Sequence, residues 1–379
     1  MESNRVNPSL GIYVHIPFCE RKCFYCDFYS IENHSRRDEF TASLIKEIGL
    51  FSDRHPQFQA DTIFFGGGTP SLLKPREVER ILKALHEAFD ITGQVEFTME
   101  CNPGTVDTAY LSEYRQLGVN RISFGVQSFF DDELKFLQRI HTSKEAVEAF
   151  EKARKGGFED INIDLMYALP GQLAERHITN LGRAILLHPT HLSVYALIVE
   201  SGTPLFKAVE KREITPADDE TEAAMYEATM NFLVGSGYNH YEVSNYSLQG
   251  RECRHNLKYW NSEDYIGFGP SAHSHLQNNR WWNVSSLREY LGLLDDGTMP
   301  VASTEALTRE QMLDEFLFLQ LRQGKLDLDR LRAEFSFDPD QEFISHAIDS
   351  GHFERAEGVL RLTNKGFTVC DEIAKEMLR

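Results

Sequence analysis

The sequence lacks any apolar run near the roughly 20 residues that a membrane-spanning helix needs. It also lacks low-complexity tracts, and its 13 prolines and 25 glycines are too few for a collagen-like or long disordered segment. Residues 1–8 are polar and contain no apolar core of a secretory signal. We therefore expect a cytoplasmic globular protein, and 379 residues suffice for one large core plus a smaller domain.

Positive charge is scarce as well. The chain has 39 Lys and Arg against 58 Asp and Glu, which gives a formal net charge of −19. A surface this acidic repels phosphate backbones unless it carries a local basic stripe, and the sequence contains no basic block. Nucleic acid is therefore not an expected partner.

Cysteines are few, and half of them are close together. Cys19, Cys23 and Cys26 lie within eight residues, whereas Cys101, Cys253 and Cys370 are scattered. A secreted disulfide framework would spread its cysteines through a short chain. In a chain of enzyme size, a tight group indicates a metal-binding or catalytic site instead.

Strand-like and helical patterns alternate over the first half of the chain. Helical faces recur at 38–51 and from Pro75 onward, between strand-like runs bounded by turn residues. Such alternation predicts an α/β protein with parallel strands joined by right-handed crossovers. Six units fit a partial (β/α)6 barrel and also an open doubly wound sheet, which periodicity does not distinguish. The predicted strands are 10–15, 62–65, 95–100, 121–125, 161–166 and 191–197.

The second half is organised differently. A helix at about 218–234 precedes an aromatic and histidine-rich stretch at 238–282 that fits no simple period. Short helices and a hairpin at 353–362, turned at Glu357-Gly358, predict a smaller winged-helix-like α+β module. From Glu305 to Arg379 carboxylates outnumber cationic side chains by 16 to 10, so we expect a packing or lid role rather than DNA binding. The predicted divisions are a core at 1–236, a connecting and lid region at 237–305, and the module at 306–379.

The strongest chemical signal is Cys19-x3-Cys23-x2-Cys26, just past the first predicted strand. Ligand sites of parallel sheets gather at this carboxyl end. Thiolates commonly hold iron–sulfur clusters, and three of them leave one iron of a [4Fe–4S] cubane open to an outside chelator. A zinc site with His15 as fourth ligand, or a disulfide with one thiol left over, are the alternatives.

This loop, with the string from Tyr13 to Cys19 and Gly66-Gly67-Gly68-Thr69-Pro70 downstream, resembles the radical S-adenosylmethionine (SAM) superfamily. The similarity is to the branch of oxygen-independent coproporphyrinogen III oxidases and HemW-type heme chaperones, and it extends over essentially the whole chain. It implies a [4Fe–4S] cluster on the three cysteines and SAM as a second cofactor. The residues that the resemblance places against SAM are Tyr13, Tyr25, Gly67, Gly68, Thr69, Glu100, Gln127, Arg139 and Asp164.

Each of these residues also has an ordinary structural interpretation. The glycine run could be only a turn. The polar side chains could be structural ion pairs or helix caps, which perturb titration in the same way. Arg139 falls in a helical pattern at 134–139, and Asp164 falls in an apolar run where an unpaired carboxylate is costly.

Two departures separate this chain from the oxidases of that branch. Those oxidases have a further cysteine two residues after the third, where this chain has Phe28. They also have an N-terminal arm, whereas only about nine residues precede the first predicted strand here. Both features resemble the HemW-type proteins and disfavour coproporphyrinogen decarboxylation. Whether the protein is an enzyme stays open.

His255-Asn256-x-x-Tyr259-Trp260 resembles the heme-binding motif of the HemW-type proteins. Histidine is a common axial haem ligand, and aromatic rings offer flat apolar surface to a macrocycle. A surface loop packed on the barrel is the alternative. Further candidates for the heme ligand are His273, His275 and Cys253.

The resemblance as a whole implies a HemW-type heme chaperone. Such a protein would bind heme and deliver it to apo-haemoproteins, including those of the respiratory chain. An oxygen-independent coproporphyrinogen III oxidase and another radical SAM enzyme are the competing interpretations. Association into a homodimer and transient contact with a membrane are also compatible with this interpretation.

Overall fold

The computed structural model describes residues 9–356 and 358–378, and its centre is a large mixed sheet. Six strands within it are parallel and adjacent in chain order, from β1 to β6. A doubly wound sheet reverses its strand order at a switch point, and this sheet does not. The fold is therefore the predicted partial (β/α)6 barrel. The six strands are β1 (Leu10–Ile16), β2 (Gln59–Gly67), β3 (Asp90–Cys101), β4 (Arg121–Gln127), β5 (Asp160–Tyr167) and β6 (His191–Ala196).

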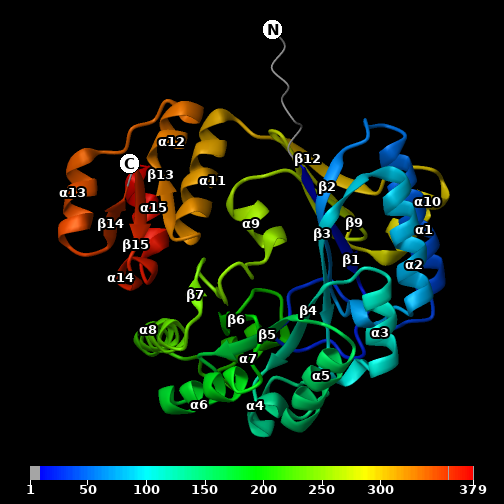
Figure 1. Cartoon of the computed structure of the whole chain (residues 1–379), viewed down its shortest axis with the longest axis horizontal. Helices are drawn as coiled ribbons and strands as arrows, with labels where there is room; N and C mark the ends of the chain where they lie inside the picture. Colours follow the sequence, from blue (N-terminus) through cyan, green and yellow to red (C-terminus); the bar gives the residue numbers. More distant parts are fainter. Residues whose placement is uncertain (1–8, 357, 379) are drawn as a thin grey trace.

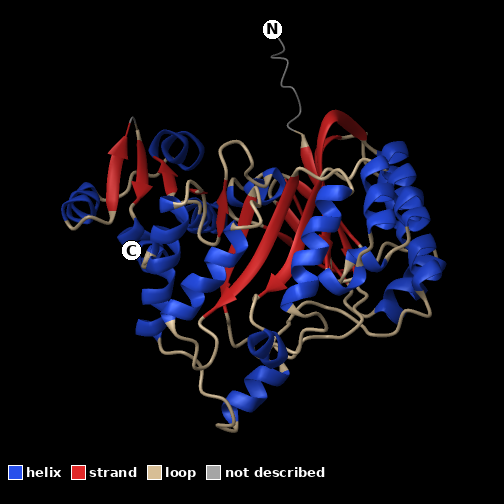
Figure 2. Ribbon diagram, turned by 60° about the horizontal axis from the view of Figure 1, so that its bottom comes forward, coloured by secondary structure: helices blue, strands red, loops and turns tan. Residues whose placement is uncertain are grey.

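Helices cover the outside of these strands (Figures 1 and 2). In α1, the predicted face of Phe40, Leu44, Ile48 and Phe51 is buried, because its 3.6-residue spacing directs it to the sheet. None of the described helices combines the length and apolar character that crossing a lipid bilayer requires. The covering helices are α1 (Arg37–Ser52), α2 (Pro75–Ala88), α3 (Thr108–Gln116), α4 (Asp131–Phe136), α5 (Ser143–Lys155) and α6 (Ala174–Ile185).

The aromatic and histidine-rich region extends the same sheet at both edges. Beside β1 lie β9 (Tyr265–Phe268), β10 (His273–Leu276), β11 (Asn279–Asn283) and β12 (Val301–Ala306). Beside β6 lie β8 (Asn245–Ser247) and β7 (Asn239–His240). The barrel thus stays open between these edges, and the divisions at 236 and 305 stay predictions. The helices between β6 and β12 in the sequence are α7 (Pro204–Glu210), α8 (Asp219–Gly235), α9 (Arg254–Trp260) and α10 (Leu287–Asp295).

The C-terminal module combines helices with a three-stranded sheet ordered β13-β15-β14, as a winged-helix-like domain does. It lies beside the barrel near α9 (Figure 1). The predicted hairpin is confirmed, although Glu357 of its turn lies outside the described residues. The elements are α11 (Arg309–Arg322), β13 (Lys325–Asp327), α12 (Leu328–Phe335), α13 (Gln341–Asp349), β14 (Phe353–Ala356), β15 (Val359–Leu362), α14 (Asn364–Phe367) and α15 (Cys370–Met377).

A buried carboxylate joins the first helix to the β9–β11 edge of the sheet. Glu47 of α1 accepts hydrogen bonds from Tyr290 Oη at 2.5 Å, Asn283 Nδ2 at 2.6 Å and the Gly269 amide at 2.8 Å. Burial nevertheless raises the pKa of this carboxyl to about 7, because desolvation outweighs the three hydrogen bonds and no cation of the described residues pairs with it. One side chain thereby connects elements more than 200 residues apart in sequence.

Replacing Glu47 by Ala removes the acceptor of the Tyr290 hydroxyl and of the Gly269 amide, and one of the two acceptors of Asn283 Nδ2, which keeps the Gly269 carbonyl at 2.9 Å. We expect the free energy of unfolding to fall by about 3 kcal/mol, measured by chemical denaturation. Glu47→Gln retains one acceptor oxygen and should lose less. An Ala variant as stable as the parent would contradict this account of the edge.

Candidate functional site

The three clustered cysteines lie on a loop that leaves β1 at its carboxyl end. Two backbone bonds close the loop at its base, from the Cys19 amide to the Ile31 carbonyl at 2.9 Å and from the Ile31 amide to the Pro17 carbonyl at 2.7 Å. All six cysteines are free thiols, so the disulfide alternative does not apply. The sequence places the cysteines after the strand, and these two bonds fix how the loop folds back.

His15, the suggested fourth zinc ligand, is otherwise engaged. Its Nε2 lies 2.9 Å from the Tyr29 carbonyl, and its Nδ1 lies 3.1 Å from the Tyr13 hydroxyl. Burial lowers its pKa to about 4, so the ring is neutral and structural. The chemistry of the donor set is therefore three thiols, which fits a cubane cluster with one open iron.

A cavity of about 430 Å³ lies against the loop at the carboxyl ends of the strands. Two hydrogen-bond donors in the wall of this cavity contact cysteine sulfurs. Thr69 Oγ1 is 3.6 Å from Cys19 Sγ, and Arg139 Nη1 is 3.4 Å from Cys23 Sγ. Such donors stabilise thiolates bound to a metal. Of the predicted site residues, the cavity is lined by Cys19, Cys23, Cys26, Tyr25, Gly67, Gly68, Thr69, Glu100, Gln127, Arg139 and Asp164.

The glycine run packs closely against the cysteine loop. A Cβ on Gly67 would lie 2.5 Å from Cε1 of His15, and one on Gly68 would lie 2.7 Å from the Phe18 carbonyl oxygen. Gly67 also has φ of +105°, which side chains rarely adopt. These glycines are therefore required by the fold, besides lining the cavity; their contact with SAM stays a prediction.

Two buried carboxylates face the same cavity from neighbouring parts of the barrel. Glu100 accepts the Gly67 amide at 3.1 Å, and Asp164 accepts Asn162 Nδ2 at 2.6 Å. Burial, with the nearby Asp164 charge, raises the pKa of Glu100 to about 8, and burial raises that of Asp164 to about 6. Such groups fit the hydroxyl donors of a ribose, because those donors replace the lost water.

Arg139 and Tyr13 lie elsewhere than the sequence predicts. Arg139 was expected inside a helical stretch, but α4 ends at Phe136, and Arg139 lies in the turn that follows. There its Nη2 donates to the Gly125 carbonyl at 2.6 Å. Tyr13 lines a second, adjoining cavity instead of the first.

The second cavity, of about 240 Å³, continues into the barrel interior. It shares Glu100, Asp164 and Phe28 with the first cavity and adds His255 and Tyr259. Sequence reasoning missed several polar residues of its wall. The period-two alternation of β5 could have identified Asn162, because it shares a face with the predicted site residue Asp164. The missed residues are Arg121, Ser123, Asn162, His191, Ser193 and Tyr195.

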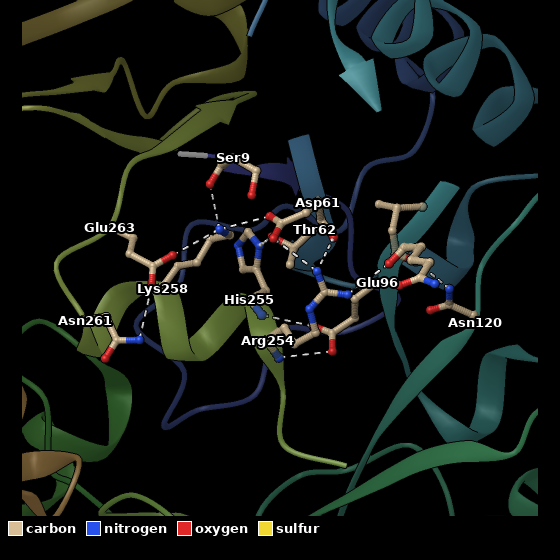
Figure 3. Close-up of polar contacts among 12 residues, drawn as sticks. Ser9, Asp61, Thr62, Glu96, Asn120, Arg254, His255, Lys258, Asn261 and Glu263 are labelled. Atoms are coloured by element: carbon tan, nitrogen blue, oxygen red, sulfur yellow. Dashed lines mark hydrogen bonds and ion pairs between the residues drawn. The ribbon is translucent and has the colours of Figure 1, made fainter. Parts of the chain in front are cut away.

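His255 lies on α9, inside the protein, and not on a surface loop (Figure 3). Its Nδ1 is 2.8 Å from Thr62 Oγ1, and its Nε2 is 2.9 Å from Tyr259 Oη. Burial lowers its pKa to about 3, so the ring is neutral and can offer a nitrogen lone pair. Of the other candidates, Cys253 lines the second cavity, whereas His273 and His275 line neither of the two.

Charged side chains hold α9 against the strands. Glu96 of β3 accepts the amides of Arg254 and His255, both at 3.0 Å, so a carboxylate caps the positive end of the helix. Lys258 Nζ is buried between the Ser9 carbonyl at 2.8 Å, Asp61 at 2.9 Å and a further carboxylate (Figure 3). These contacts attach the helix to β2 and β3.

The fold and the three-cysteine loop define a radical SAM protein, and the pattern of the Radical SAM superfamily matches residues 13–179. The heme chaperone HemW of Bacillus subtilis is 34% identical over 95% of this chain and 97% of its own. HemW of Escherichia coli is 40% identical over 70% of each chain. The chain therefore belongs to the HemW family. Coproporphyrinogen III oxidase (HemN) from Escherichia coli has the same fold, with a TM-score of 0.83, 24% identity, and coverage of 97% of this chain and 89% of that one.

The cysteine loop gives a direct prediction for iron. Anaerobic reconstitution of the parent protein should give close to four irons and four sulfides per chain. Replacing Cys19, Cys23 or Cys26 by Ala should abolish the cluster, as measured by iron analysis and absorbance. Cys370→Ala, a buried thiol of the C-terminal module, is the matched control and should retain it. Tight zinc binding with no obtainable cluster would overturn the assignment.

The raised pKa of Glu100 predicts a pH-dependent stability. The folded state holds this proton up to about pH 8, whereas the unfolded state releases it near 4.5, so ionisation lowers the free energy of unfolding as pH rises through this window. Without SAM, Glu100→Gln should therefore be more stable than the parent by about 2 kcal/mol at pH 8. At pH 5 the two should differ little. Denaturant titrations at both pH values measure this, and an equal difference at both would refute it.

Proposed function

We propose that this protein is a cytoplasmic heme chaperone that binds heme and delivers it to apo-haemoproteins, including those of the respiratory chain. It would carry a [4Fe–4S] cluster and SAM. The observation that carries the proposal is the similarity to the heme chaperone of Bacillus subtilis over 95% of the chain. Formation of a homodimer and transient membrane contact stay predictions.

The residues around the first cavity have distinct parts in this proposal. Cys19, Cys23 and Cys26 hold the cluster, which supplies an open iron for the amino and carboxylate groups of SAM. Glu100 and Asp164 accept the ribose hydroxyls, and the guanidinium of Arg139 attracts the SAM carboxylate. The other residues proposed to contact SAM are Tyr13, Tyr25, Gly67, Gly68, Thr69 and Gln127.

His255 is the proposed heme ligand, and its contacts indicate which nitrogen binds iron. Nδ1 is bonded to Thr62 of the barrel wall, which orients the ring. Nε2 is bonded only to the Tyr259 hydroxyl, on the same helix one turn away. Heme iron would therefore bind Nε2 after the Tyr259 side chain turns aside.

Decarboxylation of coproporphyrinogen III is the second candidate, favoured by the complete set of SAM-site residues around the first cavity. Phe28 argues against it. This side chain lines both cavities and is 67% exposed, at the position where the oxidases have their additional cysteine. Another radical SAM activity would use the same cavity.

Titration with hemin separates these functions. The parent protein should give a saturable Soret shift near one heme per chain, and His255→Ala should weaken binding about ten-fold or change the spectrum, because an axial ligand is lost. Tyr259→Phe should bind hemin more tightly than the parent, because Nε2 is then free.

The same samples, with cluster, SAM and reductant, should leave coproporphyrinogen III unchanged. Decarboxylation at an enzymatic rate would restore the oxidase as first candidate. Hemin binding that is indifferent to both His255→Ala and Tyr259→Phe would move the ligand to His273, His275 or Cys253.

A further inference from the structure

A line of buried polar side chains runs through the barrel interior from Asp164 to the start of α9. Asp164 accepts Asn162 Nδ2 at 2.6 Å, and Asn162 Oδ1 lies 2.7 Å from Nδ1 of His191. Nε2 of His191 lies 2.7 Å from the hydroxyl of Tyr241, which accepts the Cys253 amide at 3.3 Å. Cys253 is the N-cap residue of α9. The middle residues of this line, Asn162, His191 and Tyr241, have no role in the proposed binding of the cluster or of SAM.

The partners determine the direction of every bond. Because the amide oxygen of Asn162 can only accept, Nδ1 of His191 must carry a proton. A neutral ring then has a bare Nε2, so the Tyr241 hydroxyl donates to it. Ser193 Oγ donates to the same Asn162 oxygen at 3.2 Å and holds the amide in this orientation. All four bonds therefore donate toward the Asp164 carboxylate, and bonds aligned in one sense reinforce one another.

His191 stays neutral for two reasons. It is buried, and the cationic Arg121 lies near it; both lower its pKa well below its usual value. Its ring also packs against Tyr241, with centroids 5.5 Å apart. The line therefore has a single protonation pattern.

The far end of the line reaches the helix that carries His255. The Cys253 amide is held by Tyr241, while Glu96 holds the next two amides of the same helix. The Cys253 carbonyl accepts the Leu257 amide at 3.1 Å, which begins the hydrogen bonding of α9. Any shift of Tyr241 therefore acts on the first turn of α9, whereas Glu96 keeps the helix in place if Tyr241 is lost.

We propose that Asn162, His191 and Tyr241 are positioning residues that couple occupancy of the SAM cavity to the order of α9. The proposal rests on the proposed function, since it assigns SAM to Asp164 and heme to α9. Asn162 Nδ2 donates to Asp164 at 2.6 Å and Ser123 Oγ donates at 3.3 Å, which leaves further acceptor capacity on the carboxylate. Ribose hydroxyls that donate there would restrict the carboxylate further, and through it each successive partner down to Cys253. Heme binding at His255 then meets a helix whose ordering is already complete, so SAM strengthens it.

The first test needs no heme. Amide hydrogen exchange of residues 253–260 is measured by mass spectrometry in cluster-loaded protein, with and without saturating SAM. In the parent, SAM should slow exchange there about five-fold. Tyr241→Phe removes one hydroxyl and should lose this protection while still binding SAM, as checked by equilibrium dialysis. Tyr226→Phe is the matched control, because its hydroxyl bonds the Val243 carbonyl at 2.8 Å, outside the line.

The second test adds hemin to the same set. SAM should tighten hemin binding about five-fold in the parent and in Tyr226→Phe, and should have no effect in Tyr241→Phe. His191→Phe interrupts the line at the neighbouring residue, keeps a ring against Tyr241, and should behave as Tyr241→Phe does. It also decides the matter if Tyr241→Phe does not fold.

The outcomes distinguish the two proposals. Protection of 253–260 by SAM that persists in both Tyr241→Phe and His191→Phe would overturn the coupling. Absence of protection in the parent, with SAM bound, would overturn it equally. A parent that binds no hemin but shows the expected protection would instead overturn the chaperone proposal and leave the coupling standing.

Discussion

The close approach of the ends of β1 and β2 is the contact on which the cysteine loop and its cavity depend. The Gly68 amide donates to the Ile16 carbonyl at 2.8 Å, and neither Gly67 nor Gly68 has room for a side chain. This contact brings Thr69 within reach of Cys19 and places the glycine backbone at the cavity wall. A larger residue at either glycine would move the cysteine loop away from the strands that carry the other polar groups.

Two carboxyl groups in and beside the barrel have raised pKa values because of burial, but they differ in their hydrogen bonds. Glu47 is surrounded by three donors and stabilises the sheet edge, whereas Glu100 has only one backbone donor and a carboxylate neighbour. Glu47 therefore has a structural role, whereas the carboxyl oxygens of Glu100 can still accept hydrogen bonds from a ligand. This difference is a physical reason, independent of family resemblance, to place hydroxyl groups against Glu100.

Helix α9 lies against the interior of the barrel at the opposite end from the cysteine loop. Its contacts come from the first residues of β2 and the middle of β3, through Asp61, Thr62 and Glu96, while the cysteine loop follows the last residue of β1. Two cavities lie between these ends and share Glu100 and Asp164. The side chains of this interior connect the two ends by hydrogen bonds.

The sequence by itself determined the six strand–helix units, the cysteine loop and the C-terminal hairpin, because local periodicity and turn residues encode them. The spacing of Cys19, Cys23 and Cys26 likewise predicts a cluster-binding loop, and the structure places the three cysteines around one cavity. The choice between a partial barrel and a doubly wound sheet was decided only by the order of the strands, which depends on contacts between distant segments. The same holds for His255, whose burial against Thr62 joins residues 193 positions apart, and for the line from Asp164 to Cys253. Such contacts leave no periodic signal, since each is a single meeting of side chains that the folded chain alone brings together.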